Sequence, residues 1–357
     1  MVNANTSSFF RPAYAEAKAR SLLHSYGRNS MAWKILNPKM TLWFSRNDRG
    51  VIGYQQYRNT RIVAGAPVTD IGLMNPVAQE FEEDAAAKGQ TVCYFCAESW
   101  LTEFLKNSAR HKVILLGAHP VWNPQKWTES LSSKKSVGEL IQHARRRGVQ
   151  VEEVSAETAF SHPSYRRCLK EWLKKHRLPR LGFLVDPAIP APASGLRFFA
   201  ALKESRVIAF AVIAPVPARN GWLIEHLIRG FDAAKGTTEL LIHQVMTLIA
   251  KEGSTYATLG LAPLSRQAGL SYKKNPAWLK AFFCWLYSGG NLFFSFRGLD
   301  TFKAKFNPLA WEPVYAIVNK PRFTPSTLYH VAGAFCRMSP PLFLLSAAVR
   351  TLLPELD

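Results

Sequence analysis

The sequence is poor in the features that mark membrane-spanning, secreted and metal-binding proteins. It has no uninterrupted apolar run of the roughly 18 residues that a spanning helix needs, and its first residues lack the basic-then-apolar pattern of a leader peptide. Its cysteines are odd in number, five, and most lie in apolar runs. Cys93 and Cys96 form a lone C-x-x-C without a second Cys/His pair at metal spacing. We therefore expect buried thiols, no metal site and a reducing cytoplasm.

Acidic residues are also scarce. The chain has 25 Asp and Glu against 45 Lys and Arg, a net charge of +20. Nucleic acid and anionic membrane surfaces both reward a positive field, whereas small neutral metabolites do not require one. A soluble protein that is merely basic is the alternative. Because 48% of the residues are apolar, a disordered chain is excluded.

Motifs of nucleophilic and nucleotide-dependent enzymes are missing too. No Ser-His-Asp spacing, H-E-x-x-H motif or Walker loop occurs. The glycine-rich pyrophosphate loop of acetyl-CoA enzymes is represented only by Gly230 and Gly236. The sequence thus gives no support for catalysis through a covalent nucleophile. It also argues against an enzyme that uses acetyl-CoA as the donor.

The hydrophobic pattern predicts the same order of elements twice. In the first half, three antiparallel strands precede helix, strand, helix and strand, predicted at 41–45, 51–57, 61–65, 75–88, 92–97, 99–108 and 112–116. In the second half, after helices at 137–147 and 164–177, the predicted elements are strands and helices at 207–216, 222–229, 238–251, 256–261, 276–287, 292–296 and 313–318.

This repeated order indicates an α/β (α+β) protein made of two tandem domains of one fold. A strand meander that leads into helix, strand, helix and strand is the order of the N-acetyltransferase (GNAT) fold. We expect a GNAT-like domain over 1–130, a catalytic GNAT-like domain over 131–320, and an apolar and basic tail over 321–357. The tail either rests on lipid or packs on the second domain.

One predicted strand carries charged groups to the start of a helix. Alternation along 222–229 places Glu225 and Arg229 on one face and His226 on the other. The loop that follows supplies Asp232, and Glu239 stands in the first turn of the next helix. Such an arrangement suits an anion or acyl-donor site. The structural alternatives are an internal ion pair between Glu225 and Arg229, and a dipole interaction of Glu239.

Two further basic groups are candidates for binding. The helix predicted at 164–177 repeats cations at helical spacing, beside an apolar face and after a run of three arginines: Arg166, Lys170, Lys174 and Arg177, with Arg145, Arg146 and Arg147. These residues suit tRNA or an anionic membrane, or they form an ordinary solvated face. Arg297, Lys303 and Lys305 lie among phenylalanines near the last strand.

At these residues the chain resembles the C-terminal catalytic domain of the bacterial phosphatidylglycerol lysyl- and alanyltransferases, the multiple peptide resistance factor family. The similarity extends from about Tyr26 to Val318. Its most specific stretches are 236–239, 259–264 and 298–306, supported by 26–30, 64–67, 141–148 and 227–229.

The resemblance implies two acetyltransferase-like domains that move an aminoacyl group from a charged tRNA to the glycerol hydroxyl of phosphatidylglycerol. It implies Arg229, Glu239, Lys303 and Lys305 as catalytic residues. We expect Glu225, His226, Asp232 and Arg297 to bind substrate, and no cofactor beyond aminoacyl-tRNA as co-substrate. His226 stands where many members have Asp, which bears on the choice of amino acid.

These expectations place the protein in the cytoplasm, peripheral at the inner face of the plasma membrane. Its expected partners are aminoacyl-tRNA, an anionic phospholipid and a separate flippase, since the flippase domain of many members is not in this sequence. Two alternatives stay open. One is a GNAT-like transferase that acts on a peptidoglycan precursor or a small molecule. The other is a non-catalytic basic module that binds RNA or membrane.

Overall fold

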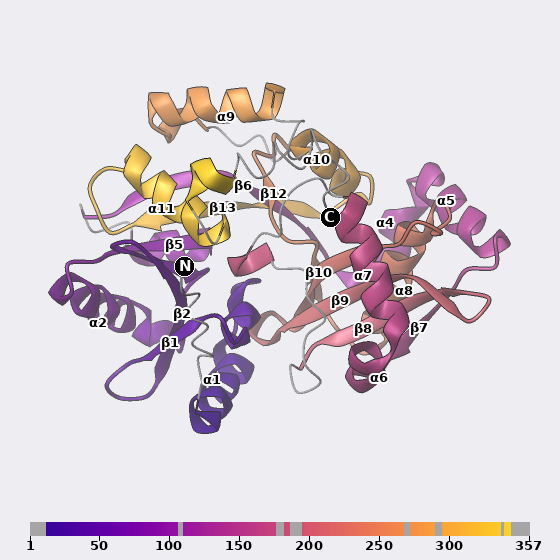
Figure 1. Ribbon diagram of the computed structural model, residues 1–357, viewed down its shortest axis with the longest axis horizontal. Helices are drawn as coiled ribbons and strands as arrows, with labels where there is room; N and C mark the ends of the chain where they lie inside the picture. The colour runs from indigo at the N-terminus through magenta and orange to yellow at the C-terminus, as the bar shows by residue number, and fades with distance from the viewer. Residues whose placement is uncertain are drawn as a thin grey trace, which may run out of the picture.

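A single 13-stranded sheet runs through the computed structural model, which describes residues 12–105, 110–175, 182–185, 195–267, 272–289, 295–336 and 339–343. The strand order is β1-β2-β3-β5-β13-β6-β11-β10-β9-β8-β7, and helices cover both faces (Figure 1). Mixed α/β architecture with two GNAT-like halves was predicted, and it is confirmed by the elements described below.

The first half follows the predicted order. Its strands are β1 (Thr41–Phe44), β2 (Gly50–Tyr57), β3 (Thr60–Ala64), the short β4 (Val68–Thr69), β5 (Thr91–Glu98) and β6 (Lys112–Trp122). Its helices are α1 (Ala13–Tyr26), α2 (Met74–Ala87) and α3 (Ser99–Leu105), with the 3-10 turn η1 at Ala32–Leu36. The hydrophobic pattern does not predict α1. The parallel pair β3–β5 follows an antiparallel meander.

The second half repeats this plan. It contains α4 (Trp127–Ser132), α5 (Lys135–Arg146), β7 (Gln150–Val154), α6 (Ala156–Ser161), α7 (Pro163–Lys175), β8 (Arg197–Lys203), β9 (Arg206–Val216), the 3-10 turn η6 (Pro217–Arg219), β10 (Gly221–Arg229) and α8 (Thr237–Lys251). The elements β11 (Tyr256–Thr258), β12 (Ala262–Pro263), η7 (Tyr272–Lys274), α9 (Ala277–Gly289), α10 (Phe296–Ala304), β13 (Ala310–Val318) and α11 (Pro325–Cys336) follow. Here the parallel pair is β10–β11. The hydrophobic pattern does not predict β7 or β8.

The two halves exchange their last strands. β13, which ends the second half, lies between β5 and β6 and pairs antiparallel with both. β6, which ends the first half, pairs in turn with β11. Neither half therefore completes its own sheet. The expected boundaries at 130 and 320 remain a proposal about chain organisation, because hydrogen bonding is continuous across them.

Separate apolar clusters fill the space on the two faces of the sheet. α2 and α3 cover one side of the first half through Phe81 and Leu101. α8, α5 and α4 cover one side of the second half through Val245, Ile141 and Trp127, and α6 and α7 cover the other. The largest cluster lies between the halves and includes Leu23, Ile35, Leu223 and Leu279.

The helix α11, in the predicted tail, packs on both halves of the protein. It packs on β2 and β3 of the first half, where His330 Nδ1 lies 2.8 Å from the Thr60 hydroxyl oxygen and Gly333 lies against Tyr57. It also packs on the second half, as one of the two expectations for the tail held: the ring of Phe335 lies 5.1 Å from that of Phe183, centre to centre, and the Phe335 carbonyl accepts from the Gly182 N–H at 2.6 Å. Among the described residues no helix combines the length and apolarity needed to cross a bilayer.

Candidate functional site

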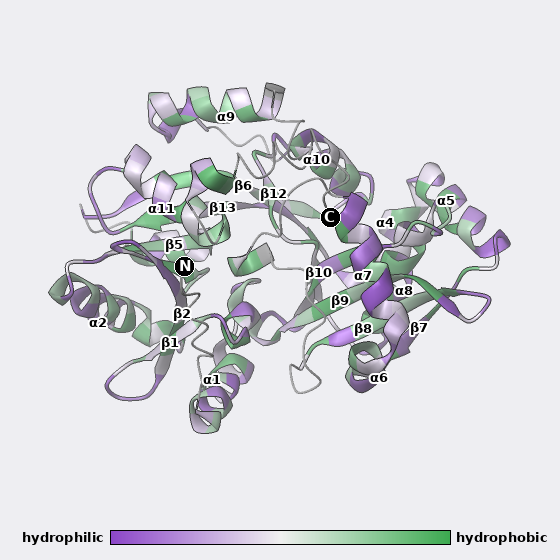
Figure 2. Cartoon of the chain, viewed as in Figure 1, coloured by the Kyte–Doolittle hydropathy of each residue, from purple (hydrophilic) through white to green (hydrophobic). Residues whose placement is uncertain are grey.

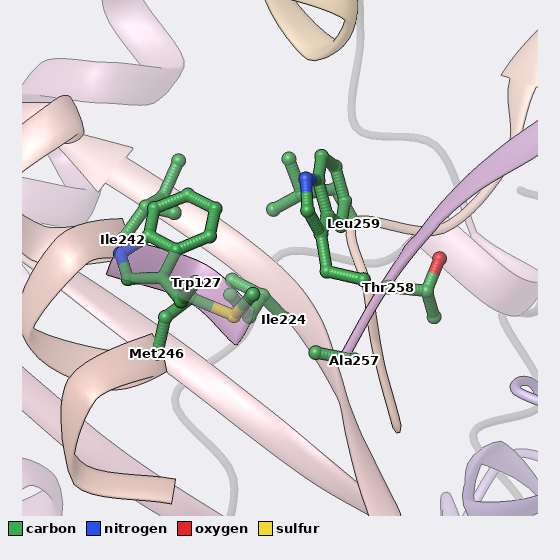
Figure 3. A pocket seen from close by; sticks show the side chains of 8 residues that line it. Trp127, Ile224, Ile242, Met246, Ala257, Thr258 and Leu259 are labelled. Carbon is green, nitrogen blue, oxygen red and sulfur yellow. The ribbon is translucent and has the colours of Figure 1, made fainter. Parts of the chain in front are cut away.

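The candidate site lies where β10 and β11 part. The two strands pair only from Gly221 to Leu223, and β11 ends at Thr258 while β10 continues to Arg229. A small, tightly packed apolar pocket lies at this divergence, and Figure 3 shows Ile224, Ile242 and Leu259 around it together with Trp127. The residues that line it are nearly all buried: Ala257 and Thr258 are fully buried, and Ile224 is 3% exposed.

A β-bulge in β10 changes the direction in which the charged residues of this strand point. The register with β9 shifts between Ile224 and His226, so Glu225 is the extra residue. Trp222, Ile224 and Leu227 consequently pack into the same cluster under α8. The predicted simple alternation is therefore wrong beyond Ile224, because a bulge adds one residue without adding a partner.

Glu225 is held by cations other than the one expected. Its carboxylate is bound by the ammonium group of Lys34, from η1, and lies 2.7 Å from His226 Nε2. Burial alone would raise the pKa of Glu225, but the charges of Lys34 and His226 lower it to about 2. The alternative of an ion pair between Glu225 and Arg229 is not realised. Arg229 instead donates from Nη2 to the carbonyl of Ala233 at 2.8 Å, in the loop before α8.

The start of α8 is fixed by a glycine that tolerates no side chain. Gly236 has φ +90°, and a Cβ there would lie 1.9 Å from the carbonyl oxygen of Leu140 in α5. Thr237 is fully buried, and its hydroxyl donates to the Ala234 carbonyl at 2.8 Å. Glu239 therefore enters the first turn of α8 in a defined position, close to the positive end of the helix dipole.

Glu239 and Lys305 form an ion pair beside the pocket. The Lys305 ammonium binds the Glu239 carboxylate and lies 4.1 Å from the ring centre of Phe302 and 5.1 Å from that of Phe306. Phe306 in turn stacks on Trp127, which lines the pocket. The structure thus brings together two predicted residues that are 66 positions apart in the sequence.

Lys303 is buried and faces backbone. Its ammonium donates to the carbonyls of Gly260 and Leu261, each at 2.8 Å, and only 5% of the residue is exposed. Burial lowers the pKa of Lys303 to about 7, partly opposed by the charge of Asp300. Lys303 therefore fixes the backbone segment that follows β11. Its partners are backbone carbonyls, whereas the partner of Lys305 is the Glu239 carboxylate.

The remaining predicted residues lie farther out. Asp232 is exposed and pairs with Arg206 at 3.3 Å. Arg297 is exposed on α10 against the ring of Tyr287, 5.7 Å from its centre. All the basic candidates that the structure describes on α5 and α7 are exposed: Arg145, Arg146, Arg147, Arg166, Lys170 and Lys174. Figure 2 colours much of α7 as hydrophilic. Arg177 lies outside the described residues.

A second charged cluster was not predicted. Arg219 donates to both carboxylate oxygens of Glu312 at 2.6 and 2.7 Å, lies 3.6 Å from Glu98 and covers the ring of Tyr256. His119 lies 3.0 Å from Glu312. Despite burial, Arg219 and His119 lower the pKa of Glu312 to about 2. Like Lys34, these residues come from distant segments, so no local pattern in the sequence could have revealed them.

No group of three or more potential metal ligands of the His, Cys, Asp and Glu types occurs in the described parts of the chain. The described cysteines are all free, and burial raises the pKa of Cys93 to about 12. A thiol in that state is protonated at neutral pH, as expected for a structural cysteine.

Comparison with solved structures establishes the fold. The structure of L-PGS from Bacillus licheniformis superimposes with a TM-score of 0.73 at 20% identity, over 89% of this chain and 95% of that one. The C-terminal domain (DUF2156) of an Agrobacterium fabrum protein named as a lysylphosphatidylglycerol synthetase gives 0.72 at 19% identity, over 95% and 97%.

Comparison with known sequences identifies the family. The chain is 23% identical to the phosphatidylglycerol lysyltransferase of Bacillus subtilis and 22% identical to that of Staphylococcus xylosus, over 87% and 85% of its length. It spans 36% of the length of each of these relatives. The family model described as "Phosphatidylglycerol lysyltransferase, C-terminal" matches residues 20–318. The chain therefore belongs to the family formed by the C-terminal domain of phosphatidylglycerol lysyltransferases.

Proposed function

We propose that the protein is an aminoacyltransferase that moves an aminoacyl group from tRNA to a hydroxyl of an anionic lipid such as phosphatidylglycerol. The observation that carries the proposal is the Glu239–Lys305 ion pair beside the pocket, in a chain that belongs to this family. The relatives named phosphatidylglycerol lysyltransferase support the lipid acceptor. The tRNA donor rests on the resemblance and on the net charge of +20.

In the proposed reaction the acceptor hydroxyl attacks the carbonyl carbon of the aminoacyl ester. A new ester bond forms, the bond to the ribose oxygen of the tRNA breaks, and the hydroxyl proton ends on that ribose oxygen. Since one ester replaces another, positioning and oxyanion stabilisation supply most of the rate enhancement. No metal or further cofactor takes part in this scheme.

Each charged group receives a role in this proposal. Glu239 holds the α-ammonium of the aminoacyl group, and Lys305, released from it, stabilises the oxyanion. Arg229 binds phosphate at the loop before α8, because its buried Nε has no partner among the described residues. Lys303 acts as a positioning residue through the carbonyls of Gly260 and Leu261. Asp232, Arg297, Glu225 and His226 stay proposed substrate contacts, with His226 bearing on the choice of amino acid.

The exposed cations of α5 and α7 are proposed to bind the tRNA backbone or the membrane. Phosphate contacts of this kind position a nucleic acid without reading its sequence. The protein would then work at the inner face of the plasma membrane as a peripheral protein, with a separate flippase moving the product. Transfer to a peptidoglycan precursor or small molecule, and binding without catalysis, are the competing outcomes of the test.

The test uses individually charged, labelled tRNAs and a total lipid extract, with chromatography of the organic phase after incubation. Label in a lipid spot that disappears after ribonuclease pretreatment is the expected result. Label in an aqueous product would instead indicate another acceptor. Binding of tRNA without any transfer would leave only a binding module.

A further inference from the structure

The helix α9 has an unusual outer face. Between 277 and 287, the exposed residues of α9 are Ala277, Ala281, Cys284 and Trp285, which recur at i, i+4, i+7 and i+8 and therefore form one stripe. A surface helix ordinarily turns charged residues outward. This stripe carries no charge, and Trp285 is 61% exposed.

The opposite face of α9 is anchored in the protein. Leu279 is fully buried in the cluster between the halves. Trp278 stacks on Phe323 with ring centres 6.3 Å apart, and Phe282 stacks on Trp285 at 6.0 Å. The exposed Trp285 is thus held in place by the ring of Phe282, which itself packs on the core. A rigidly presented aromatic side chain loses little conformational entropy when it binds.

Cations surround the stripe at both ends of the helix. Lys273 and Lys274 precede α9 in η7, and Lys280 lies in α9 itself, beside the stripe. At the other end, the guanidinium groups of Arg266 and Arg297 lie 4.3 and 5.7 Å from the ring centre of Tyr287. From Gly253 to Leu299 the sequence contains no Asp or Glu at all. The segment that carries α9 is therefore positively charged, and the next carboxylate along the chain, Asp300, is buried and binds Ser265 and Gln267.

We propose that α9 is a docking helix for an anionic phospholipid surface, and that it inserts Trp285 between headgroups while its cations contact lipid phosphates. An uncharged aromatic stripe flanked by Lys and Arg is the composition of helices that lie in the membrane interface. Figure 1 shows α9 at the edge of the molecule, at the opposite end from α1. This inference rests on the proposed function for its biological meaning, but its physical test does not.

The test is co-sedimentation with vesicles of phosphatidylcholine, with and without phosphatidylglycerol. We expect binding only to the vesicles that contain phosphatidylglycerol, and less of it at higher salt. Trp285→Ser should weaken the partition coefficient about tenfold, as expected for losing one buried aromatic side chain. Lys280→Gln should weaken it about fivefold. Tyr14→Ser is the matched control, since Tyr14 is 75% exposed on α1; it should change nothing.

Equal binding of the Trp285→Ser and Tyr14→Ser variants would overturn the inference, as would equal binding to neutral vesicles. Size-exclusion chromatography separates a further outcome: if Trp285→Ser converts a dimer to a monomer, the stripe is a subunit interface and the proposal is wrong. Transfer to phosphatidylglycerol dispersed in detergent micelles tests the active site alone and should be unaffected by Trp285→Ser. If micellar transfer is absent in the wild type while the vesicle results hold, the proposed function fails and the docking helix stands.

Discussion

At the scale of single residues, the site depends on charges that partner one another before any substrate arrives. Glu239 and Lys305 are joined, and so are Glu225 and Lys34. In the proposed reaction, a substrate ammonium replaces Lys305 at Glu239, and Lys305 becomes available to an anion in the same step. This coupling makes the pair a single functional unit in the proposed reaction.

The first prediction follows from that coupling. Glu239→Ala and Lys305→Ala should each lower kcat/KM for transfer by about 100-fold or more, and the double variant should lose little beyond the worse single variant. Lys235→Ala, which removes an exposed cation from the same loop, should retain activity. Additive losses in the double variant would show that the two residues act separately.

A second prediction concerns Lys303 and pH. Because burial lowers its pKa from 10.5 to about 7, the unfolded chain binds more protons than the folded protein between these values. Stability should therefore rise with pH through this window. Lys303→Met should flatten the rise in the free energy of unfolding, by up to about 2 kcal/mol between pH 7.5 and 9. Urea unfolding of the wild type and the variant at both pH values measures this rise. The same rise in both proteins would contradict the lowered pKa of Lys303.

At the scale of elements, sequence periodicity predicts most strands and helices well, because apolar positions repeat with the period of each element. The Glu225 bulge is not predictable in this way, since it needs the partner strand to define it. The predicted strand at 292–296 lies largely outside the described residues, but Phe296 begins α10. There, Ser295 accepts from the Gly298 N–H at 3.1 Å and caps the helix. The aromatic residues around Ser295 favour a strand in the sequence pattern, although this serine is a local signal for the start of a helix.

The contact between two family-like stretches is also explained only by the fold. Gly65 adopts φ +76°, and a Cβ there would lie 2.3 Å from the Asn29 amide oxygen. Asn29 in turn donates to the Cys96 carbonyl at 3.0 Å. Both stretches, 26–30 and 64–67, therefore support the strand arrangement, and neither sits in the proposed site.

The third prediction tests α7 as an element. Arg166→Gln combined with Lys170→Gln should weaken tRNA binding about tenfold or more and reduce the slope of log affinity against log salt by about two. Arg46→Gln, in the first half and with a side chain 87% exposed, serves as the control. Filter binding over a salt series gives both quantities. Equal slopes for the double variant and the control would assign α7 to an ordinary solvated face.

At the scale of the whole molecule, the exchange of β6 and β13 makes one folding unit of two similar halves. Local patterns predict both halves but not this exchange, because an isolated strand carries no sign of which sheet receives it. The Arg219 cluster lies at this junction and joins Glu98 of β5 to Glu312 of β13.

The fourth prediction is that the halves unfold together. Arg219→Met should lower the free energy of unfolding by roughly 3 kcal/mol or more, because Glu98 and Glu312 lose their shared cation in a buried setting. Lys88→Met, which removes a cation with a side chain 59% exposed, should cost at most about 1 kcal/mol. Urea unfolding followed by circular dichroism and tryptophan fluorescence should give coincident single transitions. Two separate transitions would contradict a shared sheet.

The central claim is that the charged site at the start of α8, with Glu239 and Lys305, transfers an aminoacyl group to an anionic lipid. It is tested most directly by incubating purified phosphatidylglycerol with each labelled aminoacyl-tRNA and the wild type or the Glu239→Ala/Lys305→Ala variant. The account predicts labelled lipid with at least one tRNA for the wild type and about 100-fold less for the variant. Equal labelling by both proteins, or no labelled lipid with any tRNA, would contradict it.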